Sequence, residues 1–422
     1  MCRLTKTLGR KWRWLSPLAR RYAESFADKP RPRRRDVEKF LRGDSGLTRA
    51  VEKYRDEISV KTRLVETHSM QPAAAAQVWS VPAIESVRTL AEWLRLSESE
   101  LQWFADLKGL QSKPNLHGTG SKLTHYYYRT LSKKTGSLRL IEEPKPHLKQ
   151  MQRRILSEIL DRVPVHPAVH GFVRGRSIQT FAAPHVGRRV VLRVDLQDFF
   201  PSFASRRVQA FFRTAGYPES VADLLGGLCT NVAPRNIWKD LEPGTGRSLV
   251  RYVQSLYSRP HLPQGAPTSP ALANICAYRI DCRLNGLAQA AGAAYTRYAD
   301  DLVFSGDEGF EKCVERFSLH VAAILIEEGF AVHQRKTRIM RQGVRQYMAG
   351  LVANQRVNVV RTDFDRLKAT LHNCVRHGPQ SQNREAHPSF RSHLEGRVGF
   401  VETINPEKGR RLRQILERIQ WQ

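Results

Sequence analysis

Hydrophobic and polar positions in the central part of the chain follow strand and helix patterns in turn. Residues 190–194 (VVLRV) form an apolar run interrupted only by Arg193, which predicts a strand buried on both faces. Two strand-like runs follow at 294–297 and 302–305, and an amphipathic helix is predicted over 148–163. Strands and helices are expected to alternate to about residue 360.

The segment before this region predicts two smaller elements. From Val81 onward, apolar residues recur at helix-face spacing, and residues 97–100 (SESE) supply a helix start, which predicts a small helical module over 81–120. Residues 126–141 then alternate around the polar sequence KKTGS at 133–137, which predicts a β-hairpin.

The C-terminal part is predicted to be helical over 363–376 and about 405–420. In the first of these helices a core-facing stripe is expected, with Thr362 or Asp363 as the cap and Gly378 at the end. The stripe consists of Phe364, Leu367, Leu371 and Cys374.

Residues 1–80 are basic and are expected to form a partly flexible arm. The run KPRPRRR at 29–35 combines prolines, which interrupt helices, with arginines that repel one another. Two interpretations stay open for this arm: a solvated linker, or an arm that binds RNA.

Charge narrows the class of partner. The chain of 422 residues has 69 Lys+Arg against 40 Asp+Glu, a net charge of +29, and a pI of about 10.4. This excess favours a nucleic acid as partner, because contacts with phosphates release counterions, although basic charge also aids solubility. No apolar run is long enough to span a bilayer, no secretory signal is visible, and the six cysteines form no C-x-x-C pair. We therefore expect a cytoplasmic protein without a membrane partner.

Three carboxylates are candidates for metal binding. Asp195 follows the buried strand, and Asp300 and Asp301 lie between the two strand-like runs, where a tight hairpin places both at one sheet edge. Acids this close repel one another unless a cation neutralises them, so they predict a site for two Mg²⁺ ions. Such a pair of ions activates a 3′-hydroxyl and stabilises leaving pyrophosphate. The alternative for Asp300 and Asp301 is an ordinary turn.

A rigid loop at 262–270 (LPQGAPTSP) precedes a predicted helix. Ser269 suits the N-cap position of that helix and Pro270 its first position. Gly265 allows the backbone to approach a ligand, and Gln264 can hydrogen-bond a nucleotide. Taken alone, the loop is also compatible with a simple helix start.

The order of these motifs, VDLQDFFPS at 194–202, QGAPTSP at 264–270 and YADD at 298–301, resembles the successive palm motifs of reverse transcriptases. The resemblance is strongest to bacterial retron-type enzymes and covers roughly residues 120–420. It implies an α+β fold of the right-hand polymerase type, with fingers at 121–190, a palm with an inserted fingers segment at 191–355, and a helical thumb at 356–422. The basic N-terminal extension would be helical.

The resemblance also implies roles for individual residues. The ring of Phe200 would lie beneath the sugar and exclude a 2′-hydroxyl, which favours deoxynucleotides (dNTPs), while Phe199 or Phe200 is expected to be a core residue. Arg139, Lys145, Gln264 and Gly265 match nucleotide-binding positions, and Lys336 matches a lysine near the pyrophosphate that can act as a general acid. Arg174 and Arg176 would lie in a loop that holds a nucleic-acid strand, and Lys368 and Arg376 would face the duplex. Each of these cations also fits a solvated surface position.

Two motifs depart from the retron pattern. Residues 181–185 (FAAPH) keep the alanine and histidine of an Asn-Ala-x-x-His element but lack its asparagine, and residues 348–350 read MAG in place of Val-Thr-Gly. These departures put in doubt priming from an RNA 2′-hydroxyl and a branched RNA–DNA product.

The resemblance implies a structured non-coding RNA as template, a possible effector protein as partner and a role in antiphage defence. Alternatives are another bacterial reverse transcriptase, of the group II intron or phage-defence type, and a non-catalytic RNA-binding protein on a polymerase scaffold. The absence of a recognisable maturation domain argues against the intron type. With no recognisable ribonuclease H domain, template removal is expected to need a host enzyme.

Overall fold

The computed structural model describes residues 8, 10, 12–27, 32, 34–59, 69–111, 124–132, 138–238 and 246–421. It consists of two compact units, Met1–His68 and Ser69–Gln422, which are described separately. The first unit contains the helices α2 (Leu15–Ser25), α3 (Arg34–Gly43) and α4 (Ser45–Lys53), which agrees with a helical extension. Most of the run at 29–35 lies outside the described residues.

A polar contact and an aromatic cluster hold this first unit together. The carboxylate of Asp44 caps α4 by accepting from the Leu47 N–H, and it also accepts two hydrogen bonds from Arg21 of α2 at 2.6 and 2.7 Å. The rings of Tyr22, Phe26 and Phe40 contact one another between α2 and α3.

The second unit is built on a five-stranded sheet in which every described strand pair is antiparallel. The strand order is β4-β5-β3-β6, and β7 also pairs with β3. The strands are β3 (Val190–Gln197), β4 (Ala294–Tyr298), β5 (Asp301–Gly306), β6 (Ala331–Val332) and β7 (Arg338–Arg341). The strands predicted at 294–297 and 302–305 are therefore confirmed.

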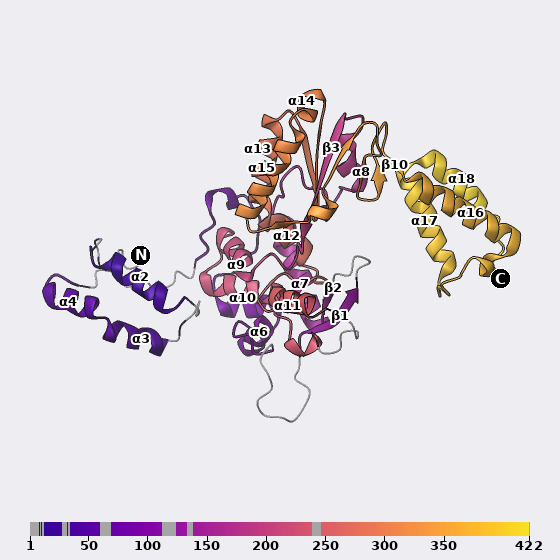
Figure 1. Ribbon diagram of the computed structural model, residues 1–422. Coiled ribbons are helices and arrows are strands. Elements are labelled where there is room, and N and C mark those ends of the chain that lie inside the picture. The colour runs from indigo at the N-terminus through magenta and orange to yellow at the C-terminus, as the bar shows by residue number, and fades with distance from the viewer. Residues whose placement is uncertain are drawn as a thin grey trace. The chain divides into compact units, whose positions relative to one another are not determined.

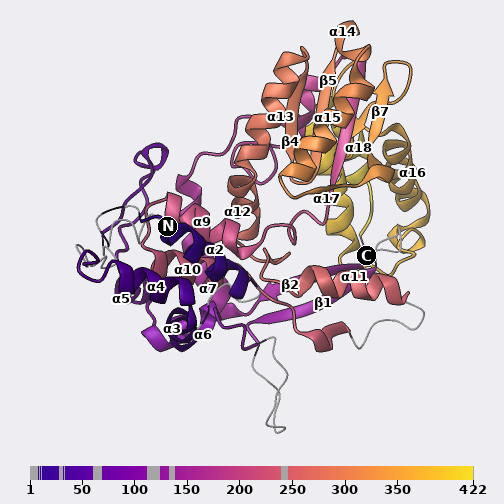
Figure 2. The same ribbon diagram turned by 60° about the vertical axis from the view of Figure 1, so that its left-hand side comes forward.

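Strand β3 is buried on both faces, as its apolar run predicts. Leu192 and Val194 belong to one hydrophobic core, together with residues of α13 (Tyr278–Ala290) and α15 (Val314–Glu327). Val191 points the other way, into a second core formed with the C-terminal helices. Figures 1 and 2 both show α13 and α15 side by side against the sheet.

The hairpin and the predicted helical module also form. Strands β1 (Tyr126–Ser132) and β2 (Leu138–Pro144) are antiparallel, and their connection at 133–137 lies outside the described residues. Ser97 caps α6 (Glu98–Ala105) in a capping box with Glu100, as the SESE sequence predicts. However, α5 (Val87–Leu94) and α6 share their core with β3, so they belong to the main unit.

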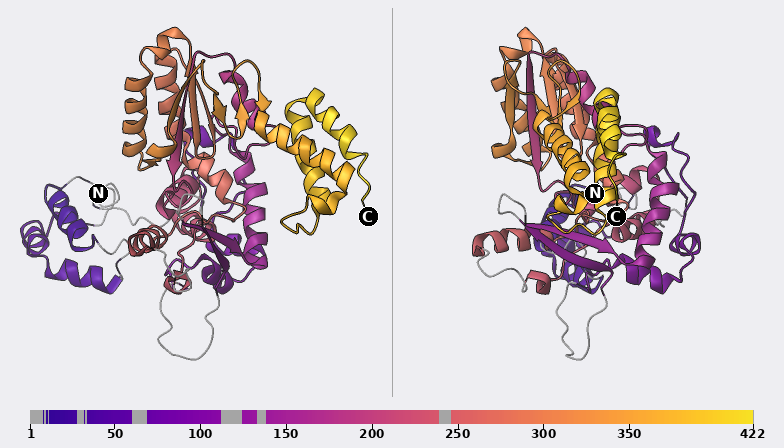
Figure 3. Two further views of the ribbon diagram at one scale, coloured as in Figure 1. Left: turned by 45° about the vertical axis from the view of Figure 1, so that its right-hand side comes forward. Right: turned by 90° about the vertical axis from the view of Figure 1, so that its right-hand side faces the viewer.

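The C-terminal helices (yellow in Figure 3) differ in part from the prediction. Helix α16 (Arg361–His377) ends at Gly378 and buries Leu367, Leu371 and Cys374, as predicted, but its N-cap is Val360. Helix α17 (Phe390–Ile404) was not predicted, because two glycines interrupt its apolar pattern. Helix α18 (Pro406–Leu416) is shorter than predicted.

The remaining elements connect these parts. The helices are α7 (Pro146–Glu158), α8 (Ile178–Ala182), α9 (Ser205–Thr214), α10 (Glu219–Cys229), α11 (Arg247–Tyr257), α12 (Ser269–Cys276) and α14 (Glu308–Glu311). A small sheet contains β8 (Tyr347–Met348), β9 (Leu351–Val352) and β10 (Asn358–Val359). Short 3-10 turns are η1 (Ala74–Ala76), η2 (Leu160–Arg162), η3 (Ala183–His185), η4 (Arg235–Trp238), η5 (Gln334–Lys336) and η6 (Pro379–Ser381). None of the described helices has the length and apolar character that crossing a membrane requires.

Candidate active site

The three predicted carboxylates gather at one end of β3 and β5. Asp195 lies directly opposite Asp301 in the antiparallel register, and Asp300 occupies the tight turn between β4 and β5. The turn requires a left-handed backbone at Ala299, with φ of 55°. A hydrogen bond of 2.9 Å from the Leu196 N–H to the Asp300 carbonyl ties this turn to β3.

Two cations bind two of these carboxylates. The Nζ of Lys336 lies 2.8 Å from Oδ1 of Asp195, and Arg193 donates two hydrogen bonds to Asp301, at 2.7 and 3.0 Å. Sequence reasoning assigned no role to Arg193. The available clue was its position, because a lone arginine in an apolar strand two residues before Asp195 lies on the same face as that aspartate.

The third carboxylate makes the electrostatics of this edge unfavourable. Burial raises the pKa of Asp300, and the neighbouring charge of Asp195 raises it further. Burial also raises the pKa of Asp301, although the Arg193 side chain acts in the opposite direction. Since burial and like charges both disfavour ionised carboxylates, this edge would be stabilised by additional positive charge.

Oxygen ligands of this kind suit a hard divalent cation. Among the described residues, however, no three acidic, histidine or cysteine side chains already form a metal-binding cluster. Two of the carboxylates are instead paired with Arg193 and Lys336. The residue types therefore fit magnesium, while their ligation would require these two ion pairs to open.

A pocket of about 680 Å³, partly open to solvent, contains the carboxylates. Its lining brings together seven predicted site residues: Asp195, Asp300, Asp301, Lys336, Arg139, Phe200 and Gln264. They come from β2, β3, the β4–β5 turn, η5 and the loops before α9 and α12. Lys145 and Gly265 are not among the described residues that line it.

Of the two adjacent phenylalanines, one is a core residue, as expected. Both line the pocket, but Phe199 is buried against Phe203 and Phe330, whereas Phe200 is only partly buried. Both lie in the turn after β3, and Asp195 lies within that strand, so the strand continues beyond the predicted end at Val194.

The loop before α12 is held against β2. The Glu142 N–H donates to the Gln264 carbonyl at 2.8 Å, and a side chain on Gly265 (φ 130°) would come within 2.9 Å of the Glu142 carbonyl. The absence of a side chain at Gly265 therefore allows the backbone of this loop to lie close to that of β2. Ser269 is the first residue of α12 and Thr268 its N-cap, one position earlier than predicted, because the Ser269 hydroxyl donates to the Pro263 carbonyl instead.

A buried contact between His261 and Glu142 also holds this loop against β2. His261 contacts Glu142 at 2.8 Å, and Asn231 donates to the same carboxylate at 2.8 Å. All three side chains are buried. Burial lowers the pKa of His261, but the charge and the hydrogen bond of Glu142 more than offset this effect and raise it, which favours the charged form of the histidine.

The other predicted nucleic-acid or nucleotide contacts lie outside the pocket. Lys145 lies over the ring of Tyr127, with its Nζ 5.3 Å from the centroid. Arg176 donates to the carbonyls of Pro167 and Val169, which makes it a structural contact of its own loop. The side chains of Arg174, Lys368 and Arg376 are exposed.

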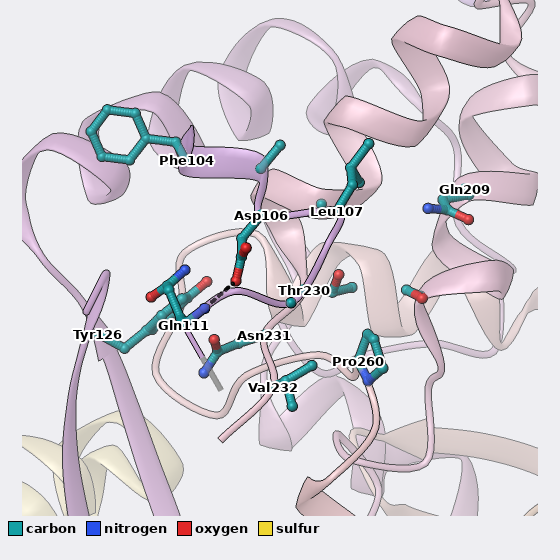
Figure 4. A pocket seen from close by; sticks show the side chains of 14 residues that line it. Phe104, Asp106, Leu107, Gln111, Tyr126, Gln209, Thr230, Asn231, Val232 and Pro260 are labelled. Atoms are coloured by element: carbon teal, nitrogen blue, oxygen red, sulfur yellow. Dashed lines mark hydrogen bonds between the residues drawn. The ribbon is translucent and has the colours of Figure 1, made fainter. Parts of the chain in front are cut away.

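A second pocket, of about 100 Å³, lies between α6, α10 and β1 (Figure 4). Its Asp106 carboxylate accepts a hydrogen bond from the Gln111 N–H at 3.1 Å. The described lining contains no lysine or arginine that would bind a phosphate. The candidate active site is therefore the first pocket, which contains Asp195, Asp300 and Asp301 and is called the acidic pocket.

Comparison with known proteins agrees with this site. Residues 131–358, which include all three carboxylates, match the family described as Reverse transcriptase (RNA-dependent DNA polymerase). The chain is 42% identical to the retron Mx65 reverse transcriptase of Myxococcus xanthus over 302 residues, which are 71% of this chain and 66% of that protein.

Two further relatives show the same relationship. The retron Mx162 reverse transcriptase of Myxococcus xanthus is 39% identical over 341 residues, 78% of this chain and 65% of that protein. The retron Ec86 reverse transcriptase of Escherichia coli is 30% identical over 284 residues, 67% of this chain and 77% of that protein. The chain thus spans just under two thirds of the length of the two Myxococcus proteins.

The matched family implies a fold of the right-hand polymerase class, and the mixed helices and antiparallel sheets of the structure agree with that class. The chain belongs to the reverse transcriptase family, and within it to the bacterial retron-type group.

Proposed function

We propose that this chain is an RNA-directed DNA polymerase that adds dNTPs to a primer. The observation that carries the proposal is the placement of Asp195 opposite Asp301, with Asp300 in the adjoining turn, inside a pocket of about 680 Å³. Arg139 and Lys336 line the same pocket and supply positive charge for a triphosphate.

The parts of the chain would correspond to those of a right-hand polymerase. The fingers would span 121–190, the palm with an inserted fingers segment 191–355, and the thumb 356–422. Support comes from the hairpin β1–β2 that carries Arg139, from the central sheet with its carboxylates, and from the C-terminal helices.

Asp195, Asp300 and Asp301 would hold two Mg²⁺ ions. When bound, such ions supply activation of the primer 3′-hydroxyl and stabilise the leaving pyrophosphate. The protein's own contribution is then to release the carboxylates: Arg193 and Lys336 give up Asp301 and Asp195 and become available to the negatively charged substrate. Lys336 lies on the short η5 turn beside Asp195 and would donate a proton to the pyrophosphate.

Phe200 would select dNTPs. Its ring lines the pocket, and behind it Phe199 packs into the core. A phenylalanine beneath the sugar leaves no space for a 2′-hydroxyl and offers it no hydrogen bond. The variant Phe200→Ala is therefore expected to admit ribonucleotides while still extending with dNTPs.

Primer extension on an RNA template tests the proposed activity. Purified protein is incubated with primed RNA, Mg²⁺, and either dNTPs or ribonucleotides, beside an Asp300→Asn, Asp301→Asn double variant. Asp307→Asn is the matched control, because Asp307 directly follows β5 at its opposite end and makes an exposed pair with Arg188. Extension with dNTPs that disappears only in the double variant supports the proposal. Loss in neither variant would contradict the assigned carboxylates.

The retron-type relatives support a more specific product. We propose that the template is a structured non-coding RNA and that synthesis yields a single-stranded DNA linked to RNA. Because the motifs at 181–185 and 348–350 depart from the retron pattern, the RNA-linked product needs a test separate from that of polymerase activity. Nucleic acid that co-purifies from cells should change mobility after either ribonuclease or deoxyribonuclease treatment. The role in antiphage defence and the effector partner rest on the resemblance alone, and a phage challenge of cells with and without the Asp300→Asn, Asp301→Asn variant tests that role.

A further inference from the structure

An exposed aromatic ring stands at the wall of the acidic pocket without an assigned role. Phe172 is 49% exposed and lines the pocket that contains Asp195, Asp300 and Asp301. Its ring centroid lies 6.2 Å from that of Phe200 and 6.3 Å from that of Tyr298. These separations fall in the range of aromatic contacts, so the three rings form a continuous aromatic wall of the pocket that holds the carboxylates.

The backbone of Phe172 is strained. Its φ is 60°, in the left-handed region that bulky residues rarely adopt. Left-handed backbone at a non-glycine residue costs free energy and persists only where the surroundings enforce it. The protein therefore holds the ring of Phe172 in one place although the backbone conformation there is unfavourable. This indicates that the ring has a role in binding.

Contacts with the catalytic turn enforce this conformation. A side chain on Gly171 would come within 2.6 Å of the Ala299 nitrogen, so the loop lies directly against the turn before Asp300. The Gly171 carbonyl accepts from Asn274 at 2.8 Å, and the His170 N–H donates to the Arg297 carbonyl at 2.8 Å.

A fully buried ion pair holds the residues that contact the loop of Phe172. Arg297 donates two hydrogen bonds to Asp281, both at 2.7 Å, and a third to Asn274 at 3.0 Å. It also donates to the Ala299 carbonyl at 3.2 Å. The loop of Phe172 and the turn of Asp300 are thus held by one set of buried side chains, and the ring has a fixed position relative to the carboxylates.

From this arrangement we infer that Phe172 is a specificity-determining residue that contacts the base pair forming between the incoming nucleotide and the template. The inference rests on the proposed polymerase function. Phe200 would lie beneath the sugar, and Tyr298 lies beside the carboxylates. The ring of Phe172 is adjacent to these two residues, so it would face the sugar side of the new base pair, which is the minor-groove side. An apolar ring there makes no base-specific hydrogen bond, so it accepts all four correct pairs and responds to their shape.

The variant Phe172→Ala tests the contact without disturbing the core. Removing an aromatic contact to one base is expected to raise KM for the correct dNTP about tenfold, while kcat changes little and misincorporation rises. Phe172→Tyr keeps the ring and should restore KM. Tyr278→Ala is the matched control, because Tyr278 is 48% exposed on α13 and is not among the described residues that line the pocket.

Phe172→Gly separates binding from a structural role. Glycine adopts positive φ without strain, so this variant should unfold at the same or a higher temperature than the unmodified protein, although it lacks the ring. It should nevertheless show the same raised KM as Phe172→Ala. A merely structural phenylalanine would give the opposite result, with lower thermal stability and an unchanged KM.

An equilibrium measurement keeps this inference separate from the proposed function. A primer ended with a dideoxynucleotide on an RNA template forms a ternary complex with the next dNTP in the absence of catalysis. Phe172→Ala should need about tenfold more dNTP for half-maximal complex formation. An unchanged dNTP requirement in Phe172→Ala overturns the assignment, and so does weaker binding of primer–template alone. Failure of extension by the unmodified protein would instead count against the polymerase function.

Discussion

Two arginine–aspartate pairs flank the same catalytic hairpin and differ in their surroundings. Arg193 binds Asp301 at the pocket, where the two side chains are 20% and 13% exposed, and Arg297 binds Asp281 behind the turn, at 1% and 0%. The shortest N–O distance is 2.7 Å in both. Geometry alone therefore does not distinguish a pair that can exchange partners from one that is permanent.

Solvent access accounts for the difference. Burial by itself would lower the pKa of Arg297, but Asp281 offsets this effect and keeps the pKa above its ordinary value. Opening that pair would leave two charges buried without partners, which is strongly unfavourable. Asp301 lines the pocket and Arg193 is partly exposed, so water, a metal ion or a triphosphate can replace either partner. We therefore interpret the Arg193–Asp301 pair as one that opens when ligands bind, and the Arg297–Asp281 pair as a permanent part of the fold.

The largest expected effect separates activity from stability at the acidic edge. Asp300→Asn should reduce dNTP incorporation by about a thousandfold or more, because a ligand of the ions that stabilise the transition state is lost. Its stability to urea should be unchanged or slightly higher, since burial and Asp195 both raise the pKa of this carboxyl and disfavour its charge. An inactive variant that is also clearly less stable would contradict this division of roles.

The opposite pattern is expected behind the turn. Asp281→Asn should lower the free energy of unfolding by about 3–5 kcal/mol, because the buried Arg297 loses its charged partner. Urea denaturation followed by circular dichroism measures the change. Asp365→Asn, which opens the exposed pair with Arg361 on α16, is the control and should change stability by less than about 0.5 kcal/mol. Equal losses in the two variants would show that burial does not distinguish these pairs.

His185, a buried residue of η3 that contacts β4 and β5, predicts an intermediate effect that depends on pH. His185 lies between the hydroxyls of Ser305 and Thr296, at 2.6 and 2.7 Å, and burial lowers its pKa to about 3. The folded state then binds a proton less readily than the unfolded state, whose histidine pKa is about 6.5. Stability from this group is complete above about pH 6.5 and declines as the pH falls toward 3, by about 2 kcal/mol between pH 7 and pH 5.

His185→Gln isolates that contribution from those of other histidines. Glutamine keeps hydrogen-bonding groups but does not titrate, so the difference in unfolding free energy between this variant and the unmodified protein should change by about 2 kcal/mol over the same interval. A difference that stays constant with pH would show that the pKa of His185 is the same in the folded and the unfolded protein.

The smallest expected effect concerns competition at the pocket. Arg193→Gln removes the cation that occupies Asp301, so less Mg²⁺ should be needed for half-maximal extension. Because partly exposed ion pairs contribute at most about 1 kcal/mol, the decrease should be roughly two- to fivefold. A Mg²⁺ titration of the initial rate measures it, with Arg189→Gln as control, since Arg189 pairs with Glu311 away from the carboxylates. An increase in the required Mg²⁺ would indicate that Arg193 assists ligation.

The sequence alone determined the elements whose causes are local. The apolar run at 190–194 predicted a strand buried on both faces, the SESE sequence predicted the start of α6, and the order of the motifs placed Asp195 near Asp300 and Asp301. Periodicity and capping depend on residues a few positions apart, so a single sequence contains that information.

Only the tertiary structure decided which cation meets which acid and which predicted contacts reach the pocket. Arg193 and Asp301 are 108 positions apart, and Lys336 and Asp195 are 141 positions apart. It also turned Arg176 toward its own loop, placed Gly265 against β2, and brought Phe172 to Phe200 and Tyr298. These outcomes depend on how distant segments pack and exclude water, and such contacts leave no periodic pattern in the sequence that would reveal them beforehand.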